Sequence, residues 1–467
     1  MTAPAPCSYK GPPFGVTATS PGHLPELSVP PVRQQLGQRR ESVRRFNKSF
    51  LVAVVSAGLL AGSLPAFAAP IGPSAPAAAA VPVLPSEVRD YTWFNTKQDA
   101  ADMHKGVAEH VRRLIDAASP GATLSLTLYY FSRLEIVEAL RNAAARGVRV
   151  RVVVDGWMVH DPKGVPFYKA LKAIPSIRVV GCDPRGSGGE PVRACMSNRM
   201  GSAPLSERPV MHDKFMTISS VQLAGGGTAN DVLYVSSANL DYYAAYESAL
   251  TITHAGLYKD YLAYFEDLMR HGSLGSVNNN YGKTFRASEH RVYTFPRKEA
   301  AGRGPRSATN DPVAEILRRT PCGSSVRTQV DLANFRIQRR AVVNELIAAQ
   351  ARGCKVRVVT GDDAFAALKT LARAMPVRLC GHTEAGGMPV HEKFMILRRG
   401  TQSTLYVGSH NLTYRALRQN DEAILALRNH AIAGPYKKRF DYLHAECNPW
   451  KPSPNVAPAT NTEIVSS

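Results

Sequence analysis

Two stretches of the chain share the same pattern of apolar and polar positions. Residues 210–218 read VMHDKFMTI and residues 390–397 read VHEKFMIL. Each pattern alternates or runs apolar, which predicts a buried strand. Because residues i and i+2 of a strand point to the same face, His212 and Lys214 project together, as do His391 and Lys393. Each strand therefore presents an imidazole beside a cation.

A second matched pair follows. Residues 233–239 (LYVSSAN) and 405–411 (LYVGSHN) each predict an apolar strand that ends in small polar residues and an asparagine. One acid comes after each asparagine in a similar setting. These acids are Glu247, in YESAL, and Glu422, in DEAIL.

Each histidine strand is preceded by a strand–helix–strand unit. In the first half the unit comprises residues 123–130, 135–146 and 148–155, and in the second half residues 325–335, 339–352 and 354–362. A crossover helix of this kind implies parallel strands. All parts recur in the same order, so the repeat spans a whole domain. The sequence predicts an α/β fold of two similar α/β-sandwich lobes related by a pseudo-twofold axis.

A chain of 467 residues suits two domains. The following segments are expected: a linker rich in Ala and Pro at residues 69–86, a first lobe at 87–271, a connecting segment at 272–311, a second lobe at 312–448 and a disordered tail at 449–467.

The start of the chain, residues 1–68, predicts a disordered leader and an export signal. Arg44 and Arg45 precede an apolar run at residues 50–62, and Ala66-Phe67-Ala68 offers a cleavage site. The twin arginines suggest export of a folded protein, while a general secretory route stays open. We expect a secreted, soluble and monomeric protein.

The formal net charge is +20, with a pI near 9.8. Residues 1–68 hold seven basic and two acidic side chains, so their removal leaves +15. Such a charge attracts polyanions or anionic membrane surfaces.

The cysteine count agrees with export, because six cysteines remain after the leader. Cys182 and Cys195 bracket a glycine-rich insertion and are the favoured disulfide. The other expected pairs are Cys354 with Cys380 and Cys322 with Cys447, with buried thiols as the alternative. The absence of a C-x-x-C pair argues against a zinc site.

The repeated residues suggest phosphate chemistry. If the lobes pack about the pseudo-twofold axis, both histidines and both lysines surround one anion, for which a phosphodiester is suited. One histidine can attack phosphorus, and the other can protonate the leaving oxygen and then activate water. A carboxylate on each ring would fix its orientation, for which Glu247 and Glu422 are candidates. This chemistry requires neither a metal nor another cofactor, and the sequence contains no evident cluster of metal ligands.

The two His-x-Lys strands, each followed by a small-residue stretch ending in Asn, resemble the phospholipase D superfamily over residues 90–447. The resemblance implies a two-lobed fold with one composite site and a phospho-histidine intermediate. Carried over to this sequence, it implies that His212 is the nucleophile, His391 the acid and base, Lys214 and Lys393 the phosphate-binding residues, and Asn239 and Asn411 further donors.

The chain departs from the family pattern at one matched pair. The family has Asp seven residues after each histidine, where this chain has Ser219 and Arg398. The hydrogen bond that this Asp makes at the end of the strand must then come from other groups. A catalytically inactive relative is the alternative that this departure allows.

Four further residues are candidates for binding substrate: Ser237, Ser409, Tyr129 and Trp157. Core packing is an equally good interpretation of Tyr129. Trp157 follows the end of a strand, where sites of α/β proteins often gather.

Three functions follow from these patterns. The first is a secreted phospholipase D that converts glycerophospholipids to phosphatidic acid at a membrane surface. The second is a secreted nuclease of the same superfamily, which the positive charge favours because phosphate contacts dominate nucleic-acid affinity. The third is a non-catalytic binder of anionic lipid or polymer.

Overall fold

The computed structural model describes residues 79–101, 105–183, 192–201, 208–299, 309–323, 327–381 and 387–452. The predicted leader and export signal, residues 1–68, lie outside the described residues.

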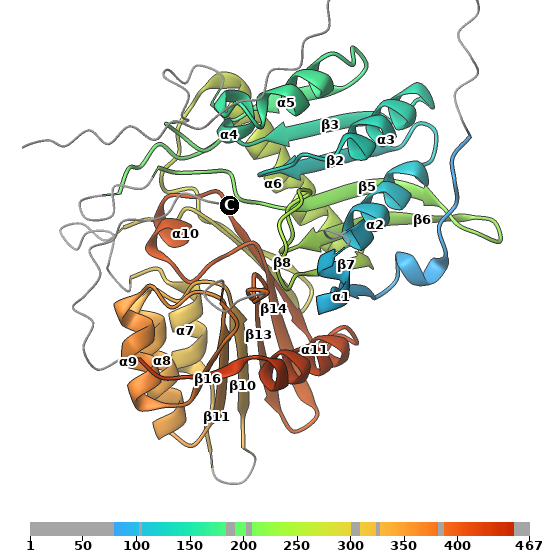
Figure 1. Cartoon of the computed structure of the whole chain (residues 1–467). Helices are drawn as coiled ribbons and strands as arrows, with labels where there is room; N and C mark the ends of the chain where they lie inside the picture. Colours follow the sequence, from blue (N-terminus) through green and yellow to red (C-terminus); the bar gives the residue numbers. More distant parts are fainter. Residues whose placement is uncertain are drawn as a thin grey trace, which may run out of the picture. The chain divides into compact units, whose positions relative to one another are not determined.

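Two sheets organise the described chain (Figure 1). The first has seven strands in the order β1-β7-β6-β5-β2-β3-β4 and the second nine in the order β16-β12-β11-β10-β13-β14-β15-β9-β8. The strands of the first sheet are β1 (Tyr91–Phe94), β2 (Thr123–Leu128), β3 (Arg149–Val154), β4 (Arg178–Gly181), β5 (Phe215–Gln222), β6 (Thr228–Ser236) and β7 (Ser248–Thr253). Those of the second are β8 (Thr284–Ala287), β9 (His290–Thr294), β10 (Gln329–Asn334), β11 (Lys355–Thr360), β12 (Val377–Leu379), β13 (Lys393–Arg399), β14 (Gln402–Gly408), β15 (Ala423–Arg428) and β16 (Asn448–Trp450).

Helices cover both sheets. They are α1 (Lys97–Ala101), α2 (Lys105–Asp116), α3 (Leu134–Ala145), α4 (Gly156–His160), α5 (Val165–Lys172), α6 (Ala255–Leu274), α7 (Pro312–Arg319), α8 (Arg340–Ala351), α9 (Ala366–Ala374), α10 (Tyr414–Arg418) and α11 (Ala433–Glu446). Figure 1 shows α7, α8 and α9 on one face of the second sheet and α11 on the other. None of the helices within the described ranges is long and apolar enough to cross a bilayer.

The predicted internal repeat is present in the hydrogen bonding of the strands. β2 pairs in parallel with β3, and β10 in parallel with β11, in the same register. Each His-x-Lys motif leads directly into a strand, β5 or β13, and that strand pairs antiparallel with the first strand of its unit. Gly147 and Gly353 follow the crossover helices at φ +88° and +98°, a left-handed conformation that favours glycine. The two-lobed α/β prediction is confirmed.

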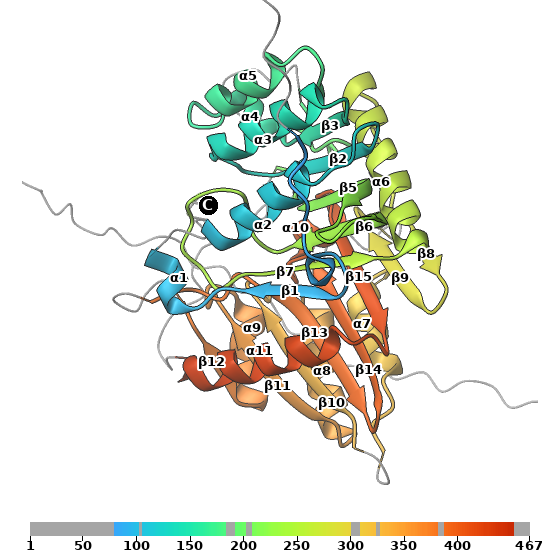
Figure 2. The same cartoon turned by 90° about the vertical axis from the view of Figure 1, so that its right-hand side faces the viewer.

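A single core cluster joins the lobes. It includes Phe215 and Leu268 of the first lobe together with Phe394 and Phe440 of the second. Burial of each such aromatic side chain contributes roughly 1.5–3 kcal/mol. The lobes therefore pack through apolar side chains, and Figure 2 shows β1 and β7 running above the second sheet.

Three segment boundaries differ from the sequence prediction. Val83, expected in the linker, is buried and forms a bridge with Leu223. The predicted connecting segment contains β8 and β9, which extend the second sheet. The predicted tail begins within β16, which pairs with β12. The strands β8, β9 and β16 are only three to five residues long, too short for an alternating pattern to stand out in the sequence.

Three disulfides are present, and only one was predicted correctly. Cys182 is bonded to Cys195, as expected. The other pairs are Cys322–Cys354 and Cys380–Cys447, in place of Cys354–Cys380 and Cys322–Cys447.

The order of the strands explains this correction. Cys354 precedes β11 and Cys380 follows β12, and these strands are parallel. The two cysteines therefore lie at opposite ends of the strands and cannot meet. Cys447 precedes β16, which is antiparallel to β12 and pairs Asn448 with Leu379, so Cys447 reaches Cys380.

Candidate active site

The backbone places each histidine beside the acid-bearing segment of the opposite lobe. The N–H of His212 donates to the carbonyl of Asp421, and the N–H of His391 to that of Tyr246, each at 2.9 Å. Both contacts belong to short parallel bridges between the lobes. The site is therefore assembled across the lobe interface.

The carboxylates cross over in the same way. His212 Nδ1 lies 3.1 Å from Glu422 Oε2, and His391 Nδ1 lies 2.5 Å from Glu247 Oε1. Each imidazole of one lobe is thus oriented by an acid of the other. Because Nδ1 is engaged, chemistry at each ring falls to Nε2. The sequence identified both acids without indicating this exchange.

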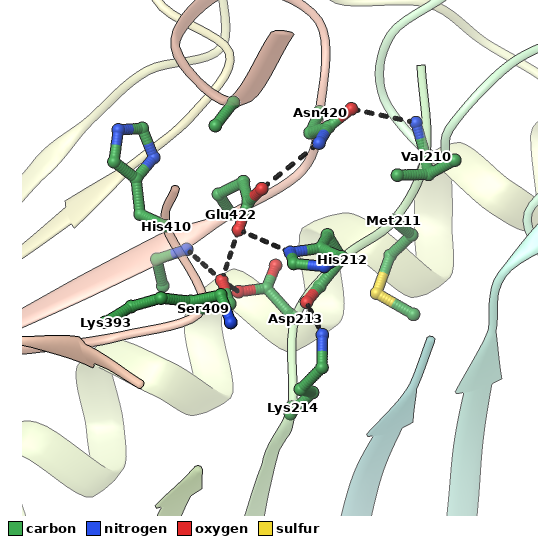
Figure 3. A network of polar contacts seen from close by, with 12 residues as sticks. Val210, Met211, His212, Asp213, Lys214, Lys393, Ser409, His410, Asn420 and Glu422 are labelled. Atoms are coloured by element: carbon green, nitrogen blue, oxygen red, sulfur yellow. Dashed lines mark hydrogen bonds and ion pairs between the residues drawn. The ribbon is translucent and has the colours of Figure 1, made fainter. Parts of the chain in front are cut away.

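Each acid also accepts a hydrogen bond from a serine hydroxyl of its own lobe. Ser237 Oγ donates to Glu247 (2.5 Å), and Ser409 Oγ donates to Glu422 (2.6 Å). Asn420 adds a donor to Glu422 at 3.1 Å. Figure 3 shows Glu422 between His212, Ser409 and Asn420. Ser237 and Ser409 are buried and give their hydroxyls to the acids, which positions the carboxylates; their predicted contact with substrate stays a prediction.

The observed strands begin later than predicted, because β5 starts one residue after Lys214 and β13 starts at Lys393, so both histidines lie just before a strand. Lys214 Nζ donates to the carbonyl of His212 (2.7 Å), and Lys393 Nζ to that of His391 (2.5 Å). Both are buried. Burial lowers the pKa of Lys214 to about 8 and that of Lys393 to about 7. A bound anion would raise both values by favouring the charged form.

Electrostatics also couples the lobes. Burial lowers the pKa of His212 well below its usual value, and the charges of Lys214, Lys393 and His391 lower it further. The imidazole is therefore neutral and available as a nucleophile. Burial raises the pKa of Glu422 to about 8. Groups from both lobes thus act on one another within a single site.

Asn239 and Asn411 occupy matched positions beyond β6 and β14. The Oδ1 atom of each is buried and has no hydrogen-bond partner among the described residues. Buried polar atoms are normally paired, so matched exceptions mark groups that a ligand would satisfy. The oxygen and nitrogen of a side-chain amide are assigned from the hydrogen bonds around them, so either atom of each asparagine can face the ligand.

Aromatic rings pack against both imidazoles. Tyr129 lies edge-on to His212 with ring centroids 4.7 Å apart, and Lys214 Nζ is 4.9 Å from the Tyr129 ring. Phe335 lies edge-on to His391 at 4.8 Å, and Tyr243 does so at 5.5 Å. Tyr129 is thus placed at the site, and its contact with substrate stays a prediction.

Phe335 was missed by the sequence analysis. It follows β10 just as Tyr129 follows β2 in the matching register, and the repeat offered this signal. Trp157 lies in α4, where its N–H donates to Asp155 (2.9 Å), and its substrate contact also stays a prediction.

Asp155 is a second residue that the sequence analysis overlooked. Its carboxylate accepts the N–H of Met211 at 2.6 Å, which ties the end of β3 to the segment before His212. Burial raises the pKa of Asp155 to about 7. A polar residue at the carboxyl end of a parallel strand was the available signal.

Other groups replace the family Asp of each motif. Ser219 Oγ accepts the N–H of Thr123 at 2.9 Å. Arg398 donates to Gln329 Oε1 at 2.5 Å. Both residues thus link the histidine strand to its neighbour, so the departure from the family pattern leaves the frame of the site in place. Across the described ranges, no three His, Cys, Asp or Glu side chains group so as to hold a metal ion.

The comparisons with known proteins agree with this geometry. The family model described as "Cardiolipin synthase, PLD-like domain" matches residues 111–269 and 324–444. The chain therefore belongs to the phospholipase D superfamily.

Two relatives are named mitochondrial cardiolipin hydrolase. The one from Xenopus tropicalis is 29% identical over 124 residues, and the one from Xenopus laevis is 30% identical over 124 residues. Each match spans 26% of this chain and 56% of the relative. The chain thus matches just over half of the length of these relatives.

A solved structure shares the fold. It is the phosphatidylserine synthase of Haemophilus influenzae Rd KW20, with a TM-score of 0.50 and 11% identity. The similarity covers 79% of this chain and 89% of that chain.

Proposed function

We propose that the protein is a phosphodiesterase that hydrolyses the headgroup ester of a phospholipid through a phospho-histidine intermediate. The exchange of carboxylates between the lobes carries this proposal. Because of this exchange, two oriented imidazoles, two buried lysines and two asparagines surround one site. These are the groups that a two-step displacement at phosphorus requires.

In the first step, Nε2 of His212 attacks phosphorus while the bond from phosphorus to the headgroup oxygen breaks. His391 gives its proton to that oxygen, and the headgroup leaves as an alcohol. In the second step, His391 takes a proton from water, whose oxygen attacks phosphorus. The phosphorus–nitrogen bond then breaks, and phosphatidic acid leaves.

Lys214 and Lys393 would neutralise the non-bridging oxygens, whose charge is shared by donors from Asn239 and Asn411. Glu247 and Glu422 would keep each Nδ1–H bonded and stabilise the ring when it carries charge. These roles explain why the same four residue types, His, Lys, Asn and Glu, recur in both lobes.

The names of the relatives favour a phospholipid substrate. Exposed apolar side chains near the asparagine segment add support: Tyr242, three residues after Asn239, is 50% exposed, and Leu134 is 59% exposed. The guanidinium of Arg133, the residue directly before Leu134, stacks on the Tyr242 ring at 4.4 Å. Such side chains suit contact with acyl chains or a bilayer surface.

A nuclease is the second candidate. The net charge of +20 supports it, because an excess of Lys and Arg attracts nucleic-acid phosphates. We further propose that the protein is exported, which three disulfides support because such bonds persist in oxidising compartments.

The test uses the purified mature protein with vesicles of phosphatidylcholine and phosphatidylethanolamine, with plasmid DNA assayed in parallel. Release of choline or ethanolamine supports the lipid assignment, and degradation of plasmid alone replaces it with the nuclease. The His212→Ala protein is the control for contaminating activity. Binding of vesicles or DNA without turnover of either would reject an enzyme.

A further inference from the structure

A basic groove crosses the second sheet, away from the histidines. Two adjacent cavities, of about 360 and 520 Å³, share Arg291, Tyr293 and Tyr406 in their linings. We call their combined surface the arginine groove. The arginines in its lining are Arg286, Arg291, Arg297, Arg319, Arg398, Arg399 and Arg428. The acids in the lining are Glu289 and Glu315, and Glu315 is paired with Arg319 at 2.5 Å.

The register of the strands shows that Arg286, Arg291 and Arg428 share one face of the sheet. Arg286 of β8 is opposite Arg291 of β9, Arg291 is opposite Ala426 of β15, and Ala426 is opposite Tyr406 of β14. Arg428 lies two residues beyond Ala426 and so points the same way. From β8 to β13 the face spans four strand spacings, roughly 19 Å. The positive charges are thus spread along a band of the sheet and are not concentrated at one position.

This arrangement costs stability in the unliganded protein. Like charges directly opposite one another on adjacent strands repel, as Arg286 and Arg291 do. Arg291 is fixed further by donating to the carbonyls of Ser288 and His290 (2.7 and 2.6 Å). Packing does not require such a pair on an open face, and a bound anion would relieve the repulsion.

The first lobe shows how the same face looks when it is covered. Tyr234, at the position matching Tyr406, is 3% exposed and lies under His110 with ring centroids 6.1 Å apart. His110 belongs to α2, whose counterpart in the second lobe is α7.

The two helices can be aligned through a shared contact. Arg146 donates to the carbonyl of Ile115, and Arg352 donates to that of Leu317, each at 3.0 Å. In this alignment His110 corresponds to Pro312, the first residue of α7. The first-lobe helix α2 begins at Lys105, five residues before His110, so α7 lacks the matching turn. The shorter helix leaves the groove open within the described residues.

We propose that the arginine groove binds single-stranded nucleic acid, at a site separate from the catalytic one. Guanidinium groups pair with phosphate oxygens, and a band of roughly 19 Å accommodates several successive phosphates. Tyr293 and Tyr406 lie among the arginines and offer rings for stacking bases. A bilayer suits the groove less well. It is hollow, and the exposed large apolar side chains of the described residues, such as Leu134 and Leu274, lie outside its lining.

The test measures binding of a fluorescein-labelled oligomer of fifteen deoxythymidines in a His212→Ala background, which prevents cleavage. The variant Arg286→Glu/Arg428→Glu changes two exposed arginines of the groove. Its matched control, Arg318→Glu/Arg373→Glu, makes the same change of charge at exposed positions outside the lining. Circular dichroism and thermal unfolding verify that both fold.

We expect the groove variant to weaken binding at least about tenfold and to flatten the dependence of log K on log salt, because fewer phosphates are neutralised. The control should lose less than about threefold in affinity. Equal losses in both variants, or no binding of the oligomer, would overturn the proposal. So would binding to vesicles containing phosphatidylglycerol that depends on the groove while oligomer binding does not, because the partner would then be a membrane.

Discussion

Nδ1 of His212 in the first lobe is 3.1 Å from Oε2 of Glu422 in the second lobe, and the relationship of His391 with Glu247 mirrors it. Neither lobe alone contains a complete histidine–carboxylate pair. The duplication in the sequence is therefore functional only as a pair of packed lobes.

Replacement of either acid should lower turnover with little change in KM. A carboxylate that orients a catalytic histidine also stabilises its charged form, so Glu422→Gln is expected to lower kcat by about 10²- to 10⁴-fold. Glu247→Gln should act similarly. Steady-state kinetics at constant pH measures the effect. The double variant Glu247→Gln/Glu422→Gln tests whether the acids act together. If its loss of activation free energy equals the sum of the two single losses, the acids do not serve one shared site.

The serines behind the acids provide a finer test. Ser237 and Ser409 donate to Glu247 and Glu422, so their replacement by Ala removes support for the carboxylates. We expect kcat to fall by about 10- to 100-fold, which corresponds to one lost hydrogen bond to a charged group, while KM stays nearly constant. A rise in KM with unchanged kcat would instead support the prediction that they bind substrate.

The buried lysines predict how activity depends on pH. Burial lowers the pKa of Lys393 to about 7 and that of Lys214 to about 8. Each lysine binds phosphate as a cation, so its contribution is present below its pKa and lost above it. We expect kcat/KM to fall as pH rises through this window.

In the variant Lys393→Arg, the arginine side chain stays charged throughout this pH range. The alkaline fall in kcat/KM should therefore move to higher pH. Bound phosphate raises the pKa of both lysines, so kcat should fall only at higher pH than kcat/KM. Superimposable profiles for the wild type and Lys393→Arg would show that Lys393 is not the group that titrates.

The disulfide pairing can be verified chemically. Peptide mapping without reduction should recover Cys322 linked to Cys354 and Cys380 linked to Cys447. Removal of Cys380 and Cys447 as a pair by Ala should lower the free energy of unfolding by about 2–5 kcal/mol, as measured by denaturant titration. Recovery of Cys354 linked to Cys380 would contradict the strand order described above.

The sequence was informative where a residue's role repeats locally. Alternation in the two strands placed His212 and Lys214 on one face, and the duplication identified Asn239, Asn411 and both acids. The exchange of acids between lobes was out of reach, because it depends on how two similar surfaces pack. Phe335 was overlooked because an apolar residue at a strand end looks like core. The two incorrect disulfide predictions also depended on tertiary arrangement. The direction of β11 relative to β12 decides which cysteines lie at the same end of the sheet and can meet.

The central claim is that two lobes place their imidazoles at one phosphorus atom, with His212 as the nucleophile. The most direct measurement is capture of the covalent intermediate with a phospholipid substrate in the His391→Ala protein. Rapid denaturation at alkaline pH, which preserves the phosphorus–nitrogen bond, is followed by peptide mass spectrometry. The account predicts a phosphatidyl adduct on His212 and its loss in His212→Ala/His391→Ala. An adduct on another residue, or hydrolysis that proceeds without His212, would contradict it.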